Sequence, residues 1–252
     1  MNDSYRGYGN AAGTMDMSVD AGLRSFMLGV YNKLGLGLLV SGLLALATAY
    51  VPAARDILFV GVTLPDGSFV AQGYTGLGMI ISFLPLALMF GSMFFMKNPT
   101  ASGSGLLYWA VVASIGASLG VVFLIYTSMS IATTFFVTAA AFGGLSLFGY
   151  TTKRNLTAIG SFLIMGLIGL IIAMIVNMFL QSEMIMFVIS AIGVLIFSGL
   201  IAYDTQRLKA TYYALGGDQA QMAVATNFGA LSLYINFINL FQFLLMFLGN
   251  RQ

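Results

Sequence analysis

The stretch that decides the fold is residues 229–243, which read GALSLYINFINLFQF. At 100° per residue on a helix, its small and amide side chains fall within one narrow arc, and bulky apolar side chains fill almost all of the rest. The arc holds Gly229, Ser232, Asn236 and Asn239, with Gln242 just beside it. Amides cannot face lipid cheaply, so we expect this polar stripe to face the inside of a helix bundle or a wet cavity. The simpler alternative is that Asn236 and Asn239 only form hydrogen bonds between helices.

The stretch belongs to the last of seven apolar runs, each close to the roughly 20 residues that a helix needs to cross a bilayer. The runs are Phe26–Tyr50, Tyr74–Met96, Gly105–Tyr126, Ile131–Tyr150, Leu156–Leu180, Met184–Tyr203 and Thr226–Leu248, and the two longest connections are 51–73 and 204–225. The 252 residues are 59% hydrophobic and 7% charged, with a mean hydropathy of +0.95, which leaves too little polar surface for a water-soluble domain. We therefore predict an all-α integral membrane protein with seven transmembrane helices over residues 26–250, after a disordered cytoplasmic tail over residues 1–25.

Several classes of function are excluded by residues that the chain does not contain. It has no Cys and no His, which rules out disulfides, thiolate or imidazole metal sites, and Ser-His or Cys-His catalytic pairs. An intramembrane aspartyl protease needs two close carboxylates, and Asp218, which sits in a polar connection, lacks the Gly-x-Gly-Asp spacing. A retinal protein needs a Lys on the seventh run, which has none. We expect no enzymatic activity and no cofactor, and the scattered charges indicate no nucleic-acid partner.

The basic residues predict the orientation in the membrane, because Lys and Arg in short loops stay on the cytoplasmic side. With the N-terminus in the cytoplasm, eight of the ten basic residues lie inside and two lie outside. The eight are Arg6, Arg24, Lys33, Lys97, Lys153, Arg154, Arg207 and Lys209, and the two are Arg55 and Arg251. Seven spans then place the C-terminus outside.

Asp204 is the carboxylate most closely attached to a span, in IAYDTQRL at residues 201–208. Arg207 follows three residues later and can pair with it across one helical turn, as an ordinary helix-end charge would. An acid at the base of a span that faces an amide stripe is nevertheless the best cation ligand that the bundle offers. We therefore select Asp204 as a candidate cation ligand.

Three stretches, in this order, resemble the Bax inhibitor-1 family, also called the transmembrane Bax-inhibitor-motif group, and its bacterial members in particular. They are TAAAFGGLSLFGYTTKRNL (138–156), AYDTQRLK (202–209) and GALSLYINFINLF (229–241), within a likeness that runs from about Arg24 to Arg251. The resemblance implies six helices surrounding a central seventh, which agrees with the polar stripe. It also implies a calcium leak gated by pH through two aspartates, one on the sixth helix and one on the seventh.

Carried over by position, the two ion-pathway and pH-sensing residues are Asp204 and Asn236, where the family usually has a second Asp. The resemblance further implies a basic latch for the first aspartate, which corresponds to Lys97, and Arg207 is the other candidate latch. Two close carboxylates titrate as a coupled pair, and Asn236 removes that coupling, so we do not expect strong gating near neutral pH. The calcium that the resemblance implies would find one carboxylate, Asp204, plus amide and backbone carbonyl oxygens, which makes Asp204 a weak calcium ligand.

Helix lengths give a conflicting expectation about this pair. Counting about 1.5 Å per residue from Met184 places Asp204 at the cytoplasmic edge of the membrane, whereas counting from Thr226 places Asn236 roughly 15 Å inside. The count predicts that the two residues do not touch, and the resemblance predicts that they do.

Together these features indicate a pH-modulated calcium or cation leak channel in a bacterial inner membrane. The alternative is a membrane interaction protein that regulates a membrane protease or a stress pathway without transporting ions. A proton-coupled secondary transporter is weaker, because no pair of interrupted spans occupies matching positions.

Overall fold

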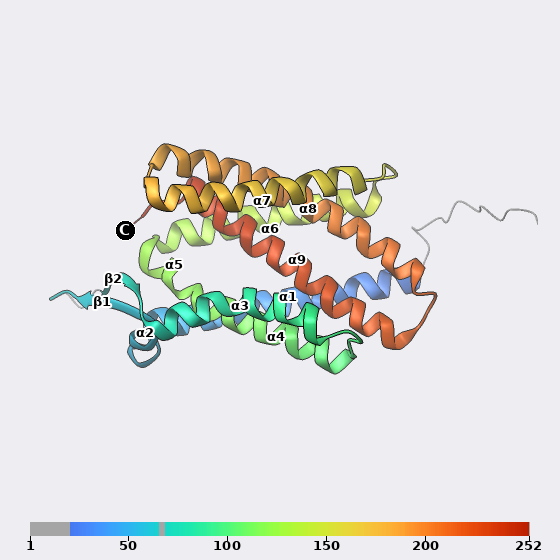
Figure 1. Cartoon of the computed structure of the whole chain (residues 1–252), viewed down its shortest axis with the longest axis horizontal. Helices are drawn as coiled ribbons and strands as arrows, with labels where there is room; N and C mark the ends of the chain where they lie inside the picture. Colours follow the sequence, from blue (N-terminus) through green and yellow to red (C-terminus); the bar gives the residue numbers. More distant parts are fainter. Residues whose placement is uncertain (1–20, 66–68, 252) are drawn as a thin grey trace, which may run out of the picture.

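The computed structural model describes residues 21–65 and 69–251, and seven helices within them are long and apolar enough to span a membrane (Figure 1). They are α1 (Ala21–Tyr50), α3 (Gly76–Phe95), α4 (Ala101–Ser118) continued by α5 (Gly120–Ile125), α6 (Ser128–Thr151), α7 (Thr157–Leu180), α8 (Glu183–Ala214) and α9 (Gln219–Leu248). Each corresponds to one predicted apolar run, so the predicted all-α membrane fold is confirmed.

Helix α9 runs through the centre of the bundle (Figure 1). It packs against α8, α1, α4 and α6. In its most apolar window of 18 residues, 56% of the residues are buried, compared with 11% for α3 and for α7. Helix α3 packs on α4, and α7 packs on α8. Six helices therefore surround a central seventh, and four of the six make the main contacts with it.

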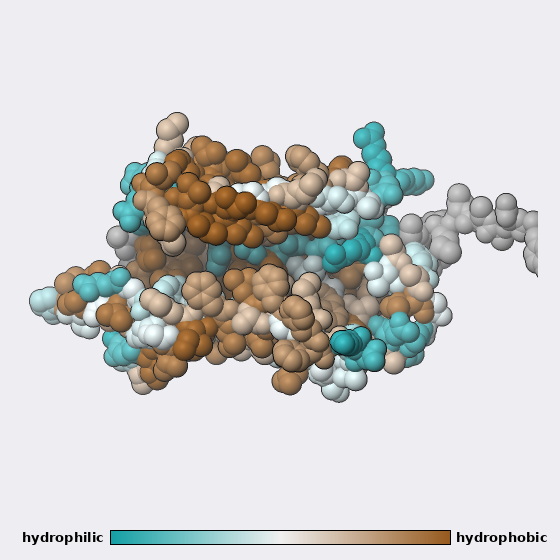
Figure 2. Space-filling model, viewed as in Figure 1, coloured by the Kyte–Doolittle hydropathy of each residue, from teal (hydrophilic) through white to brown (hydrophobic). Residues whose placement is uncertain are grey.

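The outer surface is apolar where a bilayer would cover it. Large side chains such as Phe94 and Phe95 on α3 and Phe179 on α7 are strongly exposed. Apolar residues cover much of the long sides of the molecule, and hydrophilic residues are concentrated toward its ends (Figure 2). An exposed apolar surface of this extent suits lipid rather than water.

Two boundaries differ from the sequence-based expectations. Helix α1 begins at Ala21, inside the predicted tail, whose residues 1–20 lie outside the described part of the chain. The predicted connection 51–73 contains helix α2 (Pro52–Leu58) and an antiparallel hairpin of β1 (Phe59–Thr63) and β2 (Phe69–Tyr74). Each strand is too short for its alternating pattern to stand out beside the long apolar runs.

The larger correction concerns the ends of α8 and α9. Helix α8 continues past Asp204 to Ala214, and α9 already begins at Gln219. Asp204 therefore lies inside a long helix, and the count from Met184 was wrong because it took the end of the apolar run as the end of the helix. The extra turns are held by tertiary packing, since Leu208 and Lys209 are both buried.

Asp218 caps the N-terminus of α9. Its carboxylate accepts hydrogen bonds from the backbone N–H groups of Gln221 (3.1 Å) and Ala220 (3.0 Å) and from the Gln221 side-chain amide (2.9 Å). The hydrogen bonds from Gln221, its backbone N–H first, hold the pKa of Asp218 below its usual range. This carboxylate therefore stabilises the first turn of the central helix.

Helix α6 approaches α8 most closely at Gly149. A Cβ at this position would lie 2.2 Å from the backbone carbonyl oxygen of Ala202, so the contact requires glycine. About one turn earlier on α6, the Ser146 hydroxyl lies 3.3 Å from the Thr205 hydroxyl. The close approach at Gly149 thus brings α6 against the residue that follows Asp204.

Candidate functional site

Asp204 is a buried carboxylate at the contact between α8 and α9, with only 5% of the residue exposed. Its Oδ2 accepts a hydrogen bond from the Ser232 hydroxyl at 2.5 Å and one from the Asn236 side-chain amide at 2.8 Å. Ser232 and Asn236 are four residues apart, so they lie one above the other on the same face of α9. The contact between positions 204 and 236 that the resemblance implied is present, and the expectation from helix lengths is wrong.

The polar stripe on α9 divides into parts with different contacts. Ser232 and Asn236 face Asp204, whereas the Asn239 amide donates to the backbone carbonyl oxygen of Ile235 on its own helix at 2.8 Å. Gln242 is half-buried, one turn farther along α9. Within the described structure, neither Asn239 nor Gln242 forms a hydrogen bond with Asp204. The stripe therefore supplies two of its four predicted polar side chains to the carboxylate.

The cation that pairs with Asp204 is Arg207. The Arg207 Nη2 lies 3.0 Å from the Asp204 Oδ1, across one turn of α8, and half of its side chain is exposed. The same Nη2 lies 3.4 Å from the Ser232 hydroxyl. Lys97 is exposed in the connection between α3 and α4, and among the described residues it forms no ion pair with Asp204. Of the two candidate latches, the structure thus places Arg207, and not Lys97, on the carboxylate.

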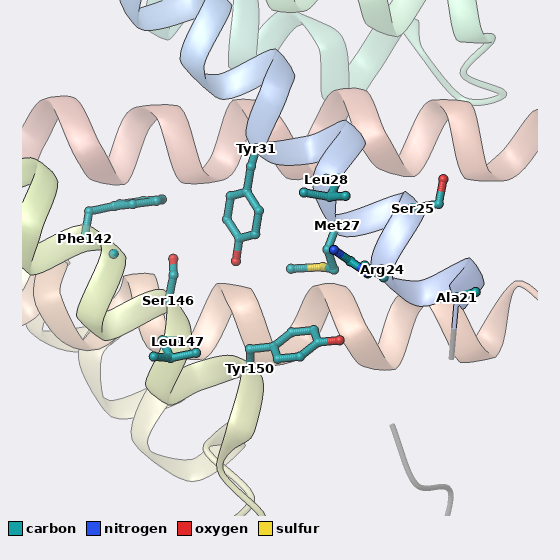
Figure 3. A pocket seen from close by; sticks show the side chains of 11 residues that line it. Ala21, Arg24, Ser25, Met27, Leu28, Tyr31, Phe142, Ser146, Leu147 and Tyr150 are labelled. Atoms are coloured by element: carbon teal, nitrogen blue, oxygen red, sulfur yellow. The ribbon is translucent and has the colours of Figure 1, made fainter. Parts of the chain in front are cut away.

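Thr205 links the site to α6 and α1. It is fully buried, and its hydroxyl donates to the Ile201 carbonyl oxygen at 2.8 Å. The Ser146 hydroxyl on α6 lies 3.3 Å from the Thr205 hydroxyl, and the Tyr31 side chain on α1 points toward Ser146 (Figure 3). Neighbouring residues of α8 therefore face different partners: Asp204 faces the central helix, and Thr205 faces a cluster of hydroxyl groups.

The next polar residues of α8 hold the connection between α6 and α7. The Gln206 amide donates to the Arg154 carbonyl oxygen at 2.8 Å and accepts from the Leu156 N–H at 2.8 Å. The buried Lys209 ammonium donates to the Tyr150 carbonyl oxygen in the last turn of α6. A cation at the C-terminal end of a helix satisfies its free carbonyl groups and its dipole. In the sequence Lys209 is evident only as a charge, and nothing there reveals these roles.

A second buried polar contact lies on α9 at Asn227, which the stripe did not include. Its amide donates to the Ala101 carbonyl oxygen at 2.9 Å and to the Ser104 hydroxyl at 2.8 Å, and its oxygen accepts from the Lys33 ammonium. The ammonium also lies 5.0 Å from the centre of the Tyr108 ring. Asn227 thus ties α9 to α1 and α4, a role that its position at the edge of the seventh apolar run did not reveal.

The chemistry available at Asp204 is that of one carboxylate beside two neutral side chains, Ser232 and Asn236, and one cation, Arg207. No group of three or more Asp, Glu, His or Cys residues suited to a metal occurs within 21–65 and 69–251. A cation at Asp204 would have one carboxylate and the oxygens of Ser232 and Asn236, which is a small set for calcium. Because the carboxylate is paired and hydrogen-bonded, a cation must compete with Arg207 to reach it.

Comparisons with known proteins give one family match and several bacterial relatives. The profile of the family described as "Inhibitor of apoptosis-promoting Bax1" matches residues 23–252. The chain is 64% identical to a protein of Caulobacter vibrioides named as uncharacterized, over the whole of both chains. It is 42% identical to the protein RP147 of Rickettsia prowazekii, over 92% of each chain. It is also 38% identical to the inner membrane protein YbhL of Escherichia coli, over 92% of this chain and 94% of the relative.

Proposed function

Because this chain belongs to the Bax inhibitor-1 family of membrane proteins, we propose that it is a leak channel for calcium or other cations, modulated by pH, in a bacterial inner membrane. The observation that carries the proposal is the placement of Asp204. A carboxylate inside a bundle of spanning helices is costly, and such residues usually serve an ion pathway. Here it faces the hydroxyl and amide of Ser232 and Asn236 on the most buried helix.

Arg207 acts as the gate in this proposal. Its guanidinium occupies one oxygen of Asp204 while half of the side chain remains exposed, so it can swing toward solvent without being drawn from a fully buried site. Release of Arg207 would leave the carboxylate free for a cation. The Asn236 amide could then turn its oxygen toward the same cation, since an amide presents both a donor and an acceptor. Conduction thus requires a mobile cation to replace the Arg207 guanidinium at the Asp204 carboxylate.

The modulation by pH rests on a single acid in this chain. Protonation of Asp204 would remove both the attraction for Arg207 and the ligand for the cation. Position 236 is Asn, so it supplies no second carboxylate to couple to Asp204, and the dependence on pH is shallow. No enzymatic activity and no cofactor are part of this proposal.

The membrane assignment and orientation complete the proposal. The Escherichia coli relative is named an inner membrane protein, and this chain matches nearly all of its length. The distribution of basic residues favours an N-terminus in the cytoplasm and a C-terminus outside. On this orientation, the connection between α8 and α9 faces the cytoplasm, and Asp204 lies on the cytoplasmic side of the bundle.

The decisive experiment is calcium flux through the purified protein in liposomes, with Asp204→Asn as the test variant. Asparagine keeps the shape and can accept the same two hydrogen bonds, but it removes the charge. We expect flux to change at least severalfold. Glu183→Gln is the matched control, because it removes an acid from the opposite end of the same helix. Equal flux and equal calcium affinity for the parent and Asp204→Asn would contradict the channel.

A membrane interaction protein that transports no ions is the second candidate. It is favoured by the closed state of the site, in which Asp204 is both paired with Arg207 and hydrogen-bonded. A parent protein that passes no calcium or other cation in liposomes at any pH would support this candidate. In that case we would look for a membrane protease as the partner. It should bind the parent protein and fail to bind variants with altered surface residues.

A further inference from the structure

An open cavity of about 1140 Å³ lies between α1 and α6 (Figure 3). Its walls come from these two helices and include Arg24, Leu28 and Tyr31 from α1 and Phe142, Leu147 and Tyr150 from α6. Other helices pass behind it in Figure 3. The volume exceeds that of most pockets for drug-sized molecules, which hold about 300–1,000 Å³. The cavity is therefore large enough for a long, flexible ligand.

The lining of the cavity is mainly apolar and carries a positive charge at one end. Arg24 is the charged side chain among the lining residues, and within the described part of the chain no ion pair engages its guanidinium. The other polar groups of the lining are hydroxyls of serine and tyrosine. Leu28, Phe142 and Leu147 supply large apolar surfaces farther from the start of α1. A ligand that matches this lining has an anionic head and an apolar chain.

The position of the cavity indicates where such a ligand comes from. Helices α1 and α6 both have the length and composition of membrane spans, so an opening between them faces the bilayer. Arg24 lies in the first turn of α1, at the end of the span, where lipid headgroups are found. In Figure 3 the Arg24 side chain points from α1 toward the space beside Tyr31, and Leu147 and Phe142 lie across it on α6.

We propose that the cavity between α1 and α6 binds an anionic membrane phospholipid, with its phosphate at Arg24 and one acyl chain against Leu28, Phe142 and Leu147. A guanidinium binds phosphate through paired hydrogen bonds as well as charge. A soluble phosphate would leave the apolar walls uncovered, and a neutral lipid would gain nothing from Arg24. The proposal does not depend on whether the protein conducts ions.

Fluorescence quenching by brominated lipids tests this site directly. The chain contains one tryptophan, Trp109 on α4, so a Trp109→Phe background removes the native signal. Leu147→Trp then places a reporter in the cavity wall. Phe162→Trp is the matched control, because it lies near the start of α7, at the same end of the bundle, and is exposed like Leu147. Each reporter is measured in phosphatidylcholine vesicles with a minor fraction of either brominated phosphatidylglycerol or brominated phosphatidylcholine.

We expect the reporter at position 147 to prefer the brominated anionic lipid by about fivefold, the value of one basic side chain near a membrane surface. The reporter at position 162 should be quenched equally by both lipids. Arg24→Gln should abolish the preference at position 147, whereas Lys153→Gln, an exposed charge between α6 and α7, should leave it unchanged. Equal quenching by both lipids at position 147, no quenching there, or the same loss in Arg24→Gln and Lys153→Gln would each overturn the proposal.

Discussion

The residues around Asp204 show how one short segment of α8 serves several neighbours at once. Asp204 faces α9, Thr205 faces the Ser146 hydroxyl on α6, and Gln206 binds the connection between α6 and α7. Arg207 pairs back to Asp204, and Lys209 caps α6. Successive helical residues point about 100° apart, so adjacent polar side chains meet different partners. A substitution here is expected to act on the element that the residue faces.

The pair at positions 204 and 236 gives a prediction at the scale of single residues. The Asn236 amide nitrogen lies 2.8 Å from Oδ2 of Asp204, so Asn236→Asp would place a second carboxylate at nearly that distance. Two such carboxylates resist joint ionisation and titrate together, although Arg207 on the other oxygen offsets part of the repulsion. We expect calcium flux in liposomes to depend more steeply on pH and closer to neutrality than in the parent.

The control for this prediction is the same substitution in an Asp204→Asn background. The repulsion needs both carboxylates, so most of the new pH dependence should disappear. If Asn236→Asp has the same effect in both backgrounds, the two positions act independently, and the pH response does not arise from their contact.

At the scale of elements, the sequence predicted each span but not how far two of them extend. The spans were predictable because an apolar run of about 20 residues has few other stable forms. The end of α8 was not, because the polar residues after Asp204 look like a loop until Leu208 and Lys209 are seen buried. The contact between Asp204 and Asn236 was predictable only from resemblance. The pairing of Arg207 with Asp204 was predictable from spacing alone, as an i,i+3 pair.

The close approach of α6 to α8 gives a prediction for these two elements. Gly149→Ala would place a methyl group 2.2 Å from the Ala202 carbonyl oxygen, and a backbone atom in a packed helix cannot move aside easily. Overpacking of this kind costs about 1–3 kcal/mol. We expect a lower melting temperature in detergent, measured by circular dichroism. Gly144→Ala is the control on the same helix: nothing lies within 4 Å of its Cβ, so stability should stay equal or rise.

This control separates helix propensity from packing. Alanine is favoured over glycine in a helix by about 1 kcal/mol, so both variants gain the same propensity and only Gly149→Ala meets the clash. A Gly149→Ala protein as stable as Gly144→Ala would show that α6 and α8 can separate at this point. The placement of Ser146 against Thr205 would then need another explanation.

At the scale of the whole molecule, the charges and connections are divided between two ends. The connections that carry Lys97, Lys153 and Arg154 lie at one end, with the turn between α8 and α9, and the hairpin and the C-terminus lie at the other (Figure 1). The C-terminal segment is held at its end: the Asn250 N–H donates to the Ser130 hydroxyl at 3.0 Å, next to the start of α6. The asymmetry of charge seen in the sequence is therefore an asymmetry of the fold.

The last prediction concerns how these two ends lie across the membrane. Because basic residues stay on the cytoplasmic side, a reporter fused after Gln252 should lie outside the cytoplasm. Only a reporter enzyme that works outside the cytoplasm should therefore be active there. A reporter inserted between Gly216 and Gly217 should be active only in the cytoplasm. Both glycines have positive φ in the exposed turn before α9, where an insertion is tolerated best. Reporters on the same side would mean that α9 does not cross the membrane. Asp204 and Asn236 would then meet on a re-entrant helix, and a leak along α9 would have no exit on the far side.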